Sequence, residues 1–130
     1  MDKEFVTFEI AKKLKEKGYP QVEKWTLAMY NEDGDWYSLC QTFDEYYYDF
    51  KDFDRHDFVC PTISQVLKWL RKEKNIYCLP FFEPGVEMWF YTIYKPKSGS
   101  GFPEFMSESD CDTYEQASLA GIEYVLNNLI

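Results

Sequence analysis

Nucleophilic chemistry in this chain would depend on four cysteines and a single histidine. The cysteines are Cys40, Cys60, Cys78 and Cys111. His56 lies closest in sequence to Cys60, and a histidine beside a thiol can accept its proton to give the reactive thiolate, with Cys40 as the other possible thiol. His56 is flanked by Arg55 and Asp57, a setting more typical of a solvated turn than of the electropositive cleft that activates a cysteine. We therefore expect no cysteine catalysis.

A zinc site is the second chemistry that these residues suggest. The cysteines are 20, 18 and 33 positions apart and form no CxxC pair. Structural zinc usually takes ligands as close pairs, because one tight turn must direct both side chains at the metal. We expect reduced, mostly buried thiols, with no bound metal and no cofactor.

Carboxylates and aromatic rings are densest in FDEYYYDFKDFDRHDF, residues 43–58. Asp49, Asp52 and Asp54 have the oxygen ligands for a divalent cation, but the glycine and distal glutamate of a calcium loop are missing. A solvated run of charges explains these carboxylates more simply.

The aromatic rings of this segment need a separate explanation, because they cannot all lie on one side of a helix or strand. Tyrosine and phenylalanine are enriched at the centres of protein interfaces. Two interpretations stay open: a long loop that places some rings in the core, or a contact surface for a protein partner or a second copy. The candidate partner-binding residues are Tyr46, Tyr47, Tyr48, Phe50 and Phe53.

The remaining signatures of enzymes are absent from the sequence. It contains no GxxxxGK[ST], GxGxxG, HExxH or GxSxG motif. We therefore predict a non-enzymatic protein.

Length and charge narrow the class further. A chain of 130 residues fits one domain, predicted as 1–130, and its 20% aromatic content provides for a core. The net charge of -9 disfavours contact with nucleic-acid backbones and anionic membranes. The N-terminal sequence MDKEFVTFEI lacks an apolar run of signal-peptide length, so we expect a cytoplasmic protein that does not enter a membrane.

A nucleic-acid-related role is the alternative from another class. The predicted helix 62–74 is basic and precedes a predicted hairpin, which is the order of a recognition helix and wing. The acidic segment suggests the opposite mode, mimicry of DNA by regularly spaced carboxylates. Those carboxylates are Asp44, Asp49, Asp52, Asp54 and Asp57.

Three helices are predicted, each opening on a threonine that can cap the first free amides: Thr7, Thr62 and Thr113. The third helix has little polar face, and its small residues Ala117, Ala120 and Gly121 permit close backbone approach. We expect it to be the most buried helix.

Two hairpins are predicted between the helices, one turning at Asp33-Gly34 and one at Glu83-Pro84-Gly85. Pro80 should confine its strand to a sheet edge, and the stretch 95–105 reads as a loop. The order is α-β-β-α-β-β-α. We expect an α+β fold with a roughly four-stranded, mainly antiparallel sheet covered by helices.

Three segments together resemble a family of small, uncharacterised bacterial proteins that are often associated with prophages or mobile elements. They are FVTFEIAKKLKEKGYP, CPTISQVLKWLRKEKNIY and DTYEQASLAGIEYVLNNLI, in that order. The resemblance implies a prophage or mobile-element gene. It carries no activity, cofactor or catalytic residue, because the similar positions are helix caps and helix faces.

If residues 43–58 form a contact surface, replacing Tyr47 and Phe50 with serine should weaken association and leave the thermal midpoint nearly unchanged. Leu67→Ala, a predicted core truncation, should lower the free energy of unfolding by about 2 to 4 kcal/mol. Sedimentation and thermal melts measure both effects. A Tyr47/Phe50 variant that unfolds as readily as Leu67→Ala, with unchanged association, would show that the segment is core.

Overall fold

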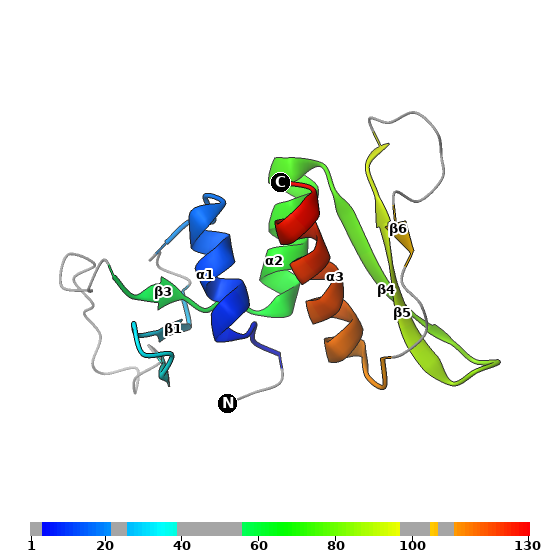
Figure 1. Ribbon diagram of the computed structural model, residues 1–130, viewed down its shortest axis with the longest axis horizontal. Coiled ribbons are helices and arrows are strands. Elements are labelled where there is room, and N and C mark those ends of the chain that lie inside the picture. The colour runs from blue at the N-terminus through cyan, green and yellow to red at the C-terminus, as the bar shows by residue number, and fades with distance from the viewer. Residues whose placement is uncertain (1–3, 22–25, 39–55, 97–104, 107–110) are drawn as a thin grey trace. The chain divides into compact units, whose positions relative to one another are not determined.

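The computed structural model describes residues 4–21, 26–38, 56–96, 105–106 and 111–130, with the backbone alone at 105–106 (Figure 1). The chain divides into two compact units, Met1–Thr62 and Ile63–Ile130, and each is described by itself. The expected single domain stays a prediction. The α+β class is confirmed, because helices and antiparallel sheets both occur in the described ranges.

Helix α1, Phe8–Glu16, opens the first unit where the threonine cap predicts it. The Thr7 hydroxyl accepts a hydrogen bond from the amide of Ile10 at 3.3 Å. The chain leaves the helix through Gly18, whose φ of +91° is a left-handed conformation that glycine adopts without strain. The helix buries one side, formed by Ile10, Ala11 and Leu14.

The first hairpin is also confirmed. Strands β1, Ala28–Tyr30, and β2, Trp36–Ser38, pair antiparallel. In the turn, the Asn31 side-chain oxygen accepts the amides of Asp33 and Asp35, both at 2.9 Å, and Gly34 takes a φ of +88°. A third strand that the sequence did not predict, β3, Phe58–Val59, pairs with the other edge of β1.

Aromatic contacts join α1 to this first sheet. The Phe8 ring lies 5.5 Å from Tyr30 and 5.7 Å from Phe58, measured between ring centroids. The Tyr30 hydroxyl donates to the Val6 carbonyl at 2.7 Å. The Lys15 ammonium lies over the Phe58 ring, 5.0 Å from its centroid, in a cation–π contact. Residue Phe58 is therefore part of the packing of this unit.

The second unit begins with α2, Ile63–Trp69, which continues as the π-helical turn η2, Leu70–Lys74. The predicted helix 62–74 is thus confirmed, with its last turn wider than an α-helix. It ends at Asn75, which takes a left-handed φ of 55°. Its buried side chains recur with helical spacing: Ile63, Val66, Leu67 and Leu70.

The second predicted hairpin follows as β4, Tyr77–Glu83, and β5, Met88–Tyr94. A short strand, β6, Phe105–Met106, pairs with the other side of β5, where the sequence predicts the end of a loop. The strand order β4-β5-β6 makes β4 an edge strand, as Pro80 predicts.

The expected sheet of about four strands, built from both hairpins, is not confirmed. The described strands form two separate three-stranded sheets, β2-β1-β3 and β4-β5-β6. Strand β3 takes the free edge of β1, and β6 takes the free edge of β5, so each hairpin extends its own sheet. Neither of these third strands is longer than two residues, which is too short to give an alternating pattern in the sequence.

Helix α3, Tyr114–Asn128, packs on the β4–β5 hairpin and against α2 (Figure 1). The Thr113 hydroxyl accepts the Gln116 amide at 3.1 Å, and the Gln116 side chain accepts the Asp112 amide at 2.7 Å, which gives a reciprocal cap. Gly121 faces the hairpin so closely that a Cβ atom there would clash with the Cys78 sulfur and lie 3.1 Å from the Tyr91 ring.

We predict that Gly121→Ala lowers the free energy of unfolding by about 1 to 2 kcal/mol, because crowding of the core outweighs the better helix propensity of alanine. The cost should be smaller in a Cys78→Ala background, which removes the sulfur. Urea unfolding measures each variant, with Asn127→Ala at an exposed position of the same helix as the control. A more stable Gly121→Ala variant would contradict the close packing.

Candidate interaction surface

The register of β4 and β5 assigns their side chains to two faces of the hairpin. Paired residues share a face, and the face alternates along each strand. The first face carries the pairs Cys78–Ile93, Pro80–Tyr91 and Phe82–Trp89. The second carries the pairs Tyr77–Tyr94, Leu79–Thr92, Phe81–Phe90 and Glu83–Met88. Helix α3 lies on the first face, because Gly121 meets Cys78 and Tyr91.

The covered face is held by specific contacts at the start of α3. The Trp89 ring meets Tyr114 edge-on, with centroids 5.6 Å apart. The Trp89 amide donates to the Cys111 carbonyl at 2.9 Å, which ties the strand to the segment before α3. Cys78, Tyr91 and the centre of this face are buried beneath the helix.

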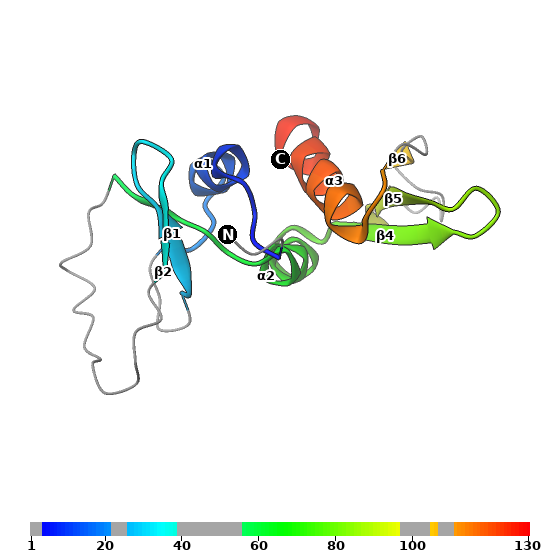
Figure 2. The ribbon, with the colours of Figure 1, turned by 90° about the horizontal axis from the view of Figure 1, so that it is seen from below.

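On the second face most side chains are apolar, and Thr92, near its centre, is buried with 4% exposure. We call this second face the aromatic sheet face and define it as Tyr77, Leu79, Phe81, Glu83, Met88, Phe90, Thr92 and Tyr94. The Phe81 and Phe90 rings lie flat on one another, with centroids 5.0 Å apart and planes inclined by 5°. Leu79 is 43% exposed. No helix among the described residues of this unit lies on this face, as Figures 1 and 2 show.

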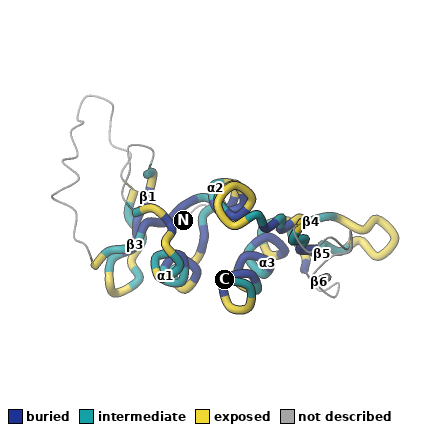
Figure 3. Tube along the Cα trace, turned by 90° about the horizontal axis from the view of Figure 1, so that it is seen from above, coloured by how far each residue is buried: buried dark blue, intermediate teal, exposed yellow. Residues whose placement is uncertain are grey.

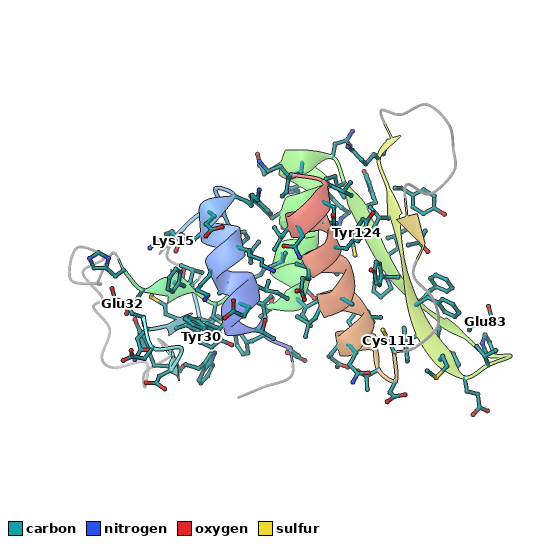
Figure 4. The ribbon with its side chains drawn as sticks, viewed as in Figure 1. Lys15, Tyr30, Glu32, Glu83, Cys111 and Tyr124 are labelled. Carbon is teal, nitrogen blue, oxygen red and sulfur yellow. The ribbon has the colours of Figure 1, made fainter. Side chains whose placement is uncertain are left out.

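Exposure increases toward the hairpin turn. Val86, in the turn, is 55% exposed, and Figure 3 shows the turn as an exposed loop beyond the helices of its unit. Glu83 and Glu87 are exposed on either side of it, and Figure 4 shows Glu83 at this end. The aromatic sheet face therefore runs into an acidic tip.

Contact through the sheet face is favoured over contact through its edge. Strand β4 is the edge, and Pro80 at its middle has no amide hydrogen to offer a further strand. An added strand would therefore lose a hydrogen bond at its centre. The flat rings of the face offer area without needing main-chain partners.

Sequence reasoning placed these residues in a hairpin without recognising them as a surface. The available signal was the absence of alternation: MWFYTIY is apolar at nearly every position. A hairpin with a helix on one face needs apolar side chains on that face alone. The surplus of rings in residues 88–94 pointed to a second apolar face.

The predicted partner-binding residues Tyr46, Tyr47, Tyr48, Phe50 and Phe53 lie outside the described residues. The carboxylates considered for mimicry of DNA also lie outside the described residues, with the exception of Asp57. Asp57 accepts a hydrogen bond from the Tyr37 hydroxyl, and its carbonyl accepts one from the Lys15 amine at 3.1 Å. This end of the acidic segment is therefore attached to the first sheet and to α1.

His56 and Cys60, the pair considered for cysteine catalysis, do not have the arrangement of a nucleophile and its base. The His56 side chain is 62% exposed, with Nδ1 3.6 Å from a Glu32 carboxylate oxygen. Cys60 is 1% exposed, and its thiol donates to the Val6 carbonyl at 3.5 Å. Burial raises the pKa of Cys60 to about 11, although hydrogen bonds with Tyr30 and Trp36 oppose the rise. This is the reverse of thiol activation.

The other described cysteines resemble Cys60. Cys78 and Cys111 are buried and form no disulfide within the described residues, whereas Cys40 lies outside them. Burial raises the pKa of Cys78 to about 12. Within the ranges that the structure covers, no group of three or more histidine, cysteine or acidic side chains is arranged to hold a metal ion.

Comparisons with known proteins do not assign the surface. No protein-family model, curated protein or solved structure matches the chain. None of the helices in the described ranges has the length and apolar character needed to cross a membrane. The properties of the aromatic sheet face therefore carry the functional argument.

We predict that the free energy of unfolding falls as the pH rises above 9. An ordinary cysteine thiol has a pKa of 9.0, and burial raises the pKa values of Cys60 and Cys78 above it. The folded state keeps both thiols protonated up to about pH 11 or 12, whereas the unfolded chain loses these protons near 9. The stabilisation is therefore complete below pH 9 and is lost as pH approaches the folded pKa, by up to about 1.4 kcal/mol per pH unit for each thiol.

Urea unfolding at a series of pH values measures this loss. Cys78→Ala should be less stable at neutral pH because it leaves a small cavity, but its stability should depend less on alkaline pH. An identical pH dependence in the variant and the wild-type protein would rule out the contribution of this thiol.

Proposed function

We propose that this protein is a non-enzymatic interaction module that acts by binding another protein surface. The observation that carries this proposal is the aromatic sheet face, a set of mostly apolar side chains around Thr92 on the side of the hairpin away from α3. Rings and a methionine are the side chains that protein interfaces use at their centres. Burying them in a complex would remove apolar area from water without ordering long, flexible side chains.

The thiols support a role without covalent catalysis. Cys60 and Cys78 are buried and hold their protons more firmly than an ordinary thiol, so neither has the properties of a nucleophile at neutral pH. Reduced, buried thiols also fit the proposal that the protein works in the cytoplasm. The family resemblance of the three helical segments adds the proposal that a prophage or mobile element encodes it.

The segment 43–58 remains a second candidate contact in this proposal. Its candidate residues, Tyr46, Tyr47, Tyr48, Phe50 and Phe53, combine rings with carboxylates, whereas the aromatic sheet face has no charged side chain until Glu83 at its end. The two surfaces therefore suit different environments. The sheet face suits a dry, flat contact, and the segment suits a contact with a wet, charged rim.

We predict that a photo-crosslinking amino acid, p-benzoylphenylalanine, in place of Leu79 gives a protein adduct in living cells, because Leu79 lies exposed within the aromatic sheet face. The adduct should disappear when Phe81→Ser and Phe90→Ser are added. The same amino acid in place of Asn127, exposed on α3, serves as the control. Gel electrophoresis and mass spectrometry identify the adducts.

Adducts at position 79 that are no more abundant than those at position 127 would contradict the proposal. Circular dichroism of the serine variant shows whether its fold is retained. If the serine variant keeps its fold and still gives the adduct, the rings do not form the contact.

A nucleic-acid role is the second candidate, and the exposed basic side chains of α2 and η2 favour it. They are Lys68, Arg71, Lys72 and Lys74. These lysines and the arginine could contact phosphates despite the negative total charge. Binding to duplex DNA that falls steeply with salt concentration and requires Lys72 and Lys74 would identify this mode.

A further inference from the structure

We infer that the aromatic sheet face binds the same face of a second copy of this chain, with the strands of the two copies antiparallel. This inference rests on the proposed function and names its partner. The result is a two-fold dimer in which two single-layer sheets become the inner layers of a sandwich, each with α3 on its outer side. Three features of the hairpin select this occupant: its charge distribution, the sizes of its side chains and its blocked edge.

Charge differs between the two ends of the hairpin. The turn end carries the exposed carboxylates of Glu83 and Glu87. The open end lies beside two lysines and one glutamate: Lys95 directly follows β5, and Lys74, whose ammonium lies over the Trp69 ring, ends the turn before β4 next to Glu73. A two-fold axis that lies between the two facing sheets, perpendicular to the strands, would place the acidic end of one copy on the basic end of the other. A two-fold axis parallel to the strands would instead bring like charges together.

Side-chain size fits the same arrangement. The centre of the face lies between Leu79 and Phe81 on β4 and between Phe90 and Thr92 on β5. A perpendicular two-fold axis through this centre places Phe81 over Leu79 and Phe90 over Thr92 of the second copy. Large rings thus meet smaller side chains, as they do where sheet layers interdigitate.

The ends of the face also match. At the turn end, Glu83 is opposite Tyr77 of the second copy, whose hydroxyl can donate to the carboxylate. Met88 is opposite Tyr94, and a thioether against an aromatic ring is a favourable contact. Each of these contacts occurs twice because of the symmetry.

The small size of the surface limits the strength of the dimer. Two strands of seven residues give a face about 23 Å long and about 10 Å wide, which is small compared with stable protein interfaces. We therefore expect a reversible dimer with a Kd on the order of 10 to 100 µM. At the edge, Pro80 hinders pairing of β4 with a second β4, so the contact involves the faces.

The test is sedimentation velocity of the full chain over a range of concentrations above and below this Kd. The wild-type protein should shift from monomer to dimer. Glu83→Lys should weaken the dimer at least about tenfold, because the turn end then loses its net negative charge, and Lys95→Glu should weaken it similarly because the open end loses its net positive charge. An equimolar mixture of the two variants should restore the dimer, since position 83 of each copy and position 95 of the other again carry opposite charges.

Glu123→Lys provides the matched control, because it makes the same charge change at an exposed position on α3. It should dimerise like the wild-type protein. Phe81→Ser should also weaken the dimer at least about tenfold. Because Glu83 is exposed, its reversal tests the inference even if Phe81→Ser fails to fold.

A wild-type protein that stays monomeric throughout would overturn the inference, as would a dimer that the mixture of charge variants does not restore. A monomer whose Leu79 crosslinks to a different protein would overturn the inference and uphold the proposed function. A monomer without specific crosslinks at Leu79 would overturn both.

Discussion

The close packing of α3 on the β4–β5 hairpin determines what the second unit can bury. Contact is closest at Gly121, where the helix backbone approaches Cys78 and Tyr91 and no side chain larger than hydrogen fits without movement. This approach brings Ile122 and Val125 of the helix, and Ile93 of the sheet, into a core without measurable exposure. The helix thereby covers the centre of one face of the hairpin, and it does not cover the other face.

Those side chains explain why the second face is a functional candidate. A hairpin in an α+β fold normally alternates apolar residues toward the helix with polar residues toward water. In β4 and β5 the outward positions include Leu79, Phe81 and Phe90. The stacking of Phe81 on Phe90 hides part of each ring, but Leu79 remains exposed beside them. Maintaining such a surface costs solubility, and its burial by a partner would offset that cost.

The sequence predicted elements governed by local chemistry. Thr7 and Thr113 cap their helices as their hydroxyls permit, Gly34 provides the left-handed residue of the first turn, and Pro80 marks the edge strand. Gly121 was also recognised as a position of close approach. Strands β3 and β6 were missed because a two-residue strand is defined by its partner and not by its own pattern. Each of them extends its own hairpin into a three-stranded sheet.

The candidate surface was harder to predict from sequence for a related reason. A run such as MWFYTIY shows that a strand is apolar, but which face a helix covers depends on the tertiary contact at Gly121. The sequence therefore directed attention to the more conspicuous rings of Tyr46, Tyr47, Tyr48, Phe50 and Phe53, which lie outside the described residues.

The most direct measurement is an NMR dilution series on the full chain, with signals assigned for the aromatic rings and the core methyl groups. Self-association through the aromatic sheet face predicts that the ring signals of Phe81 and Phe90 shift with concentration, because each ring gains neighbours from the second copy. Signals of Ile122, buried beneath α3, should stay constant. Ring signals of Phe81 and Phe90 that do not change with concentration, or shifts confined to other surfaces, would contradict the central role of this face.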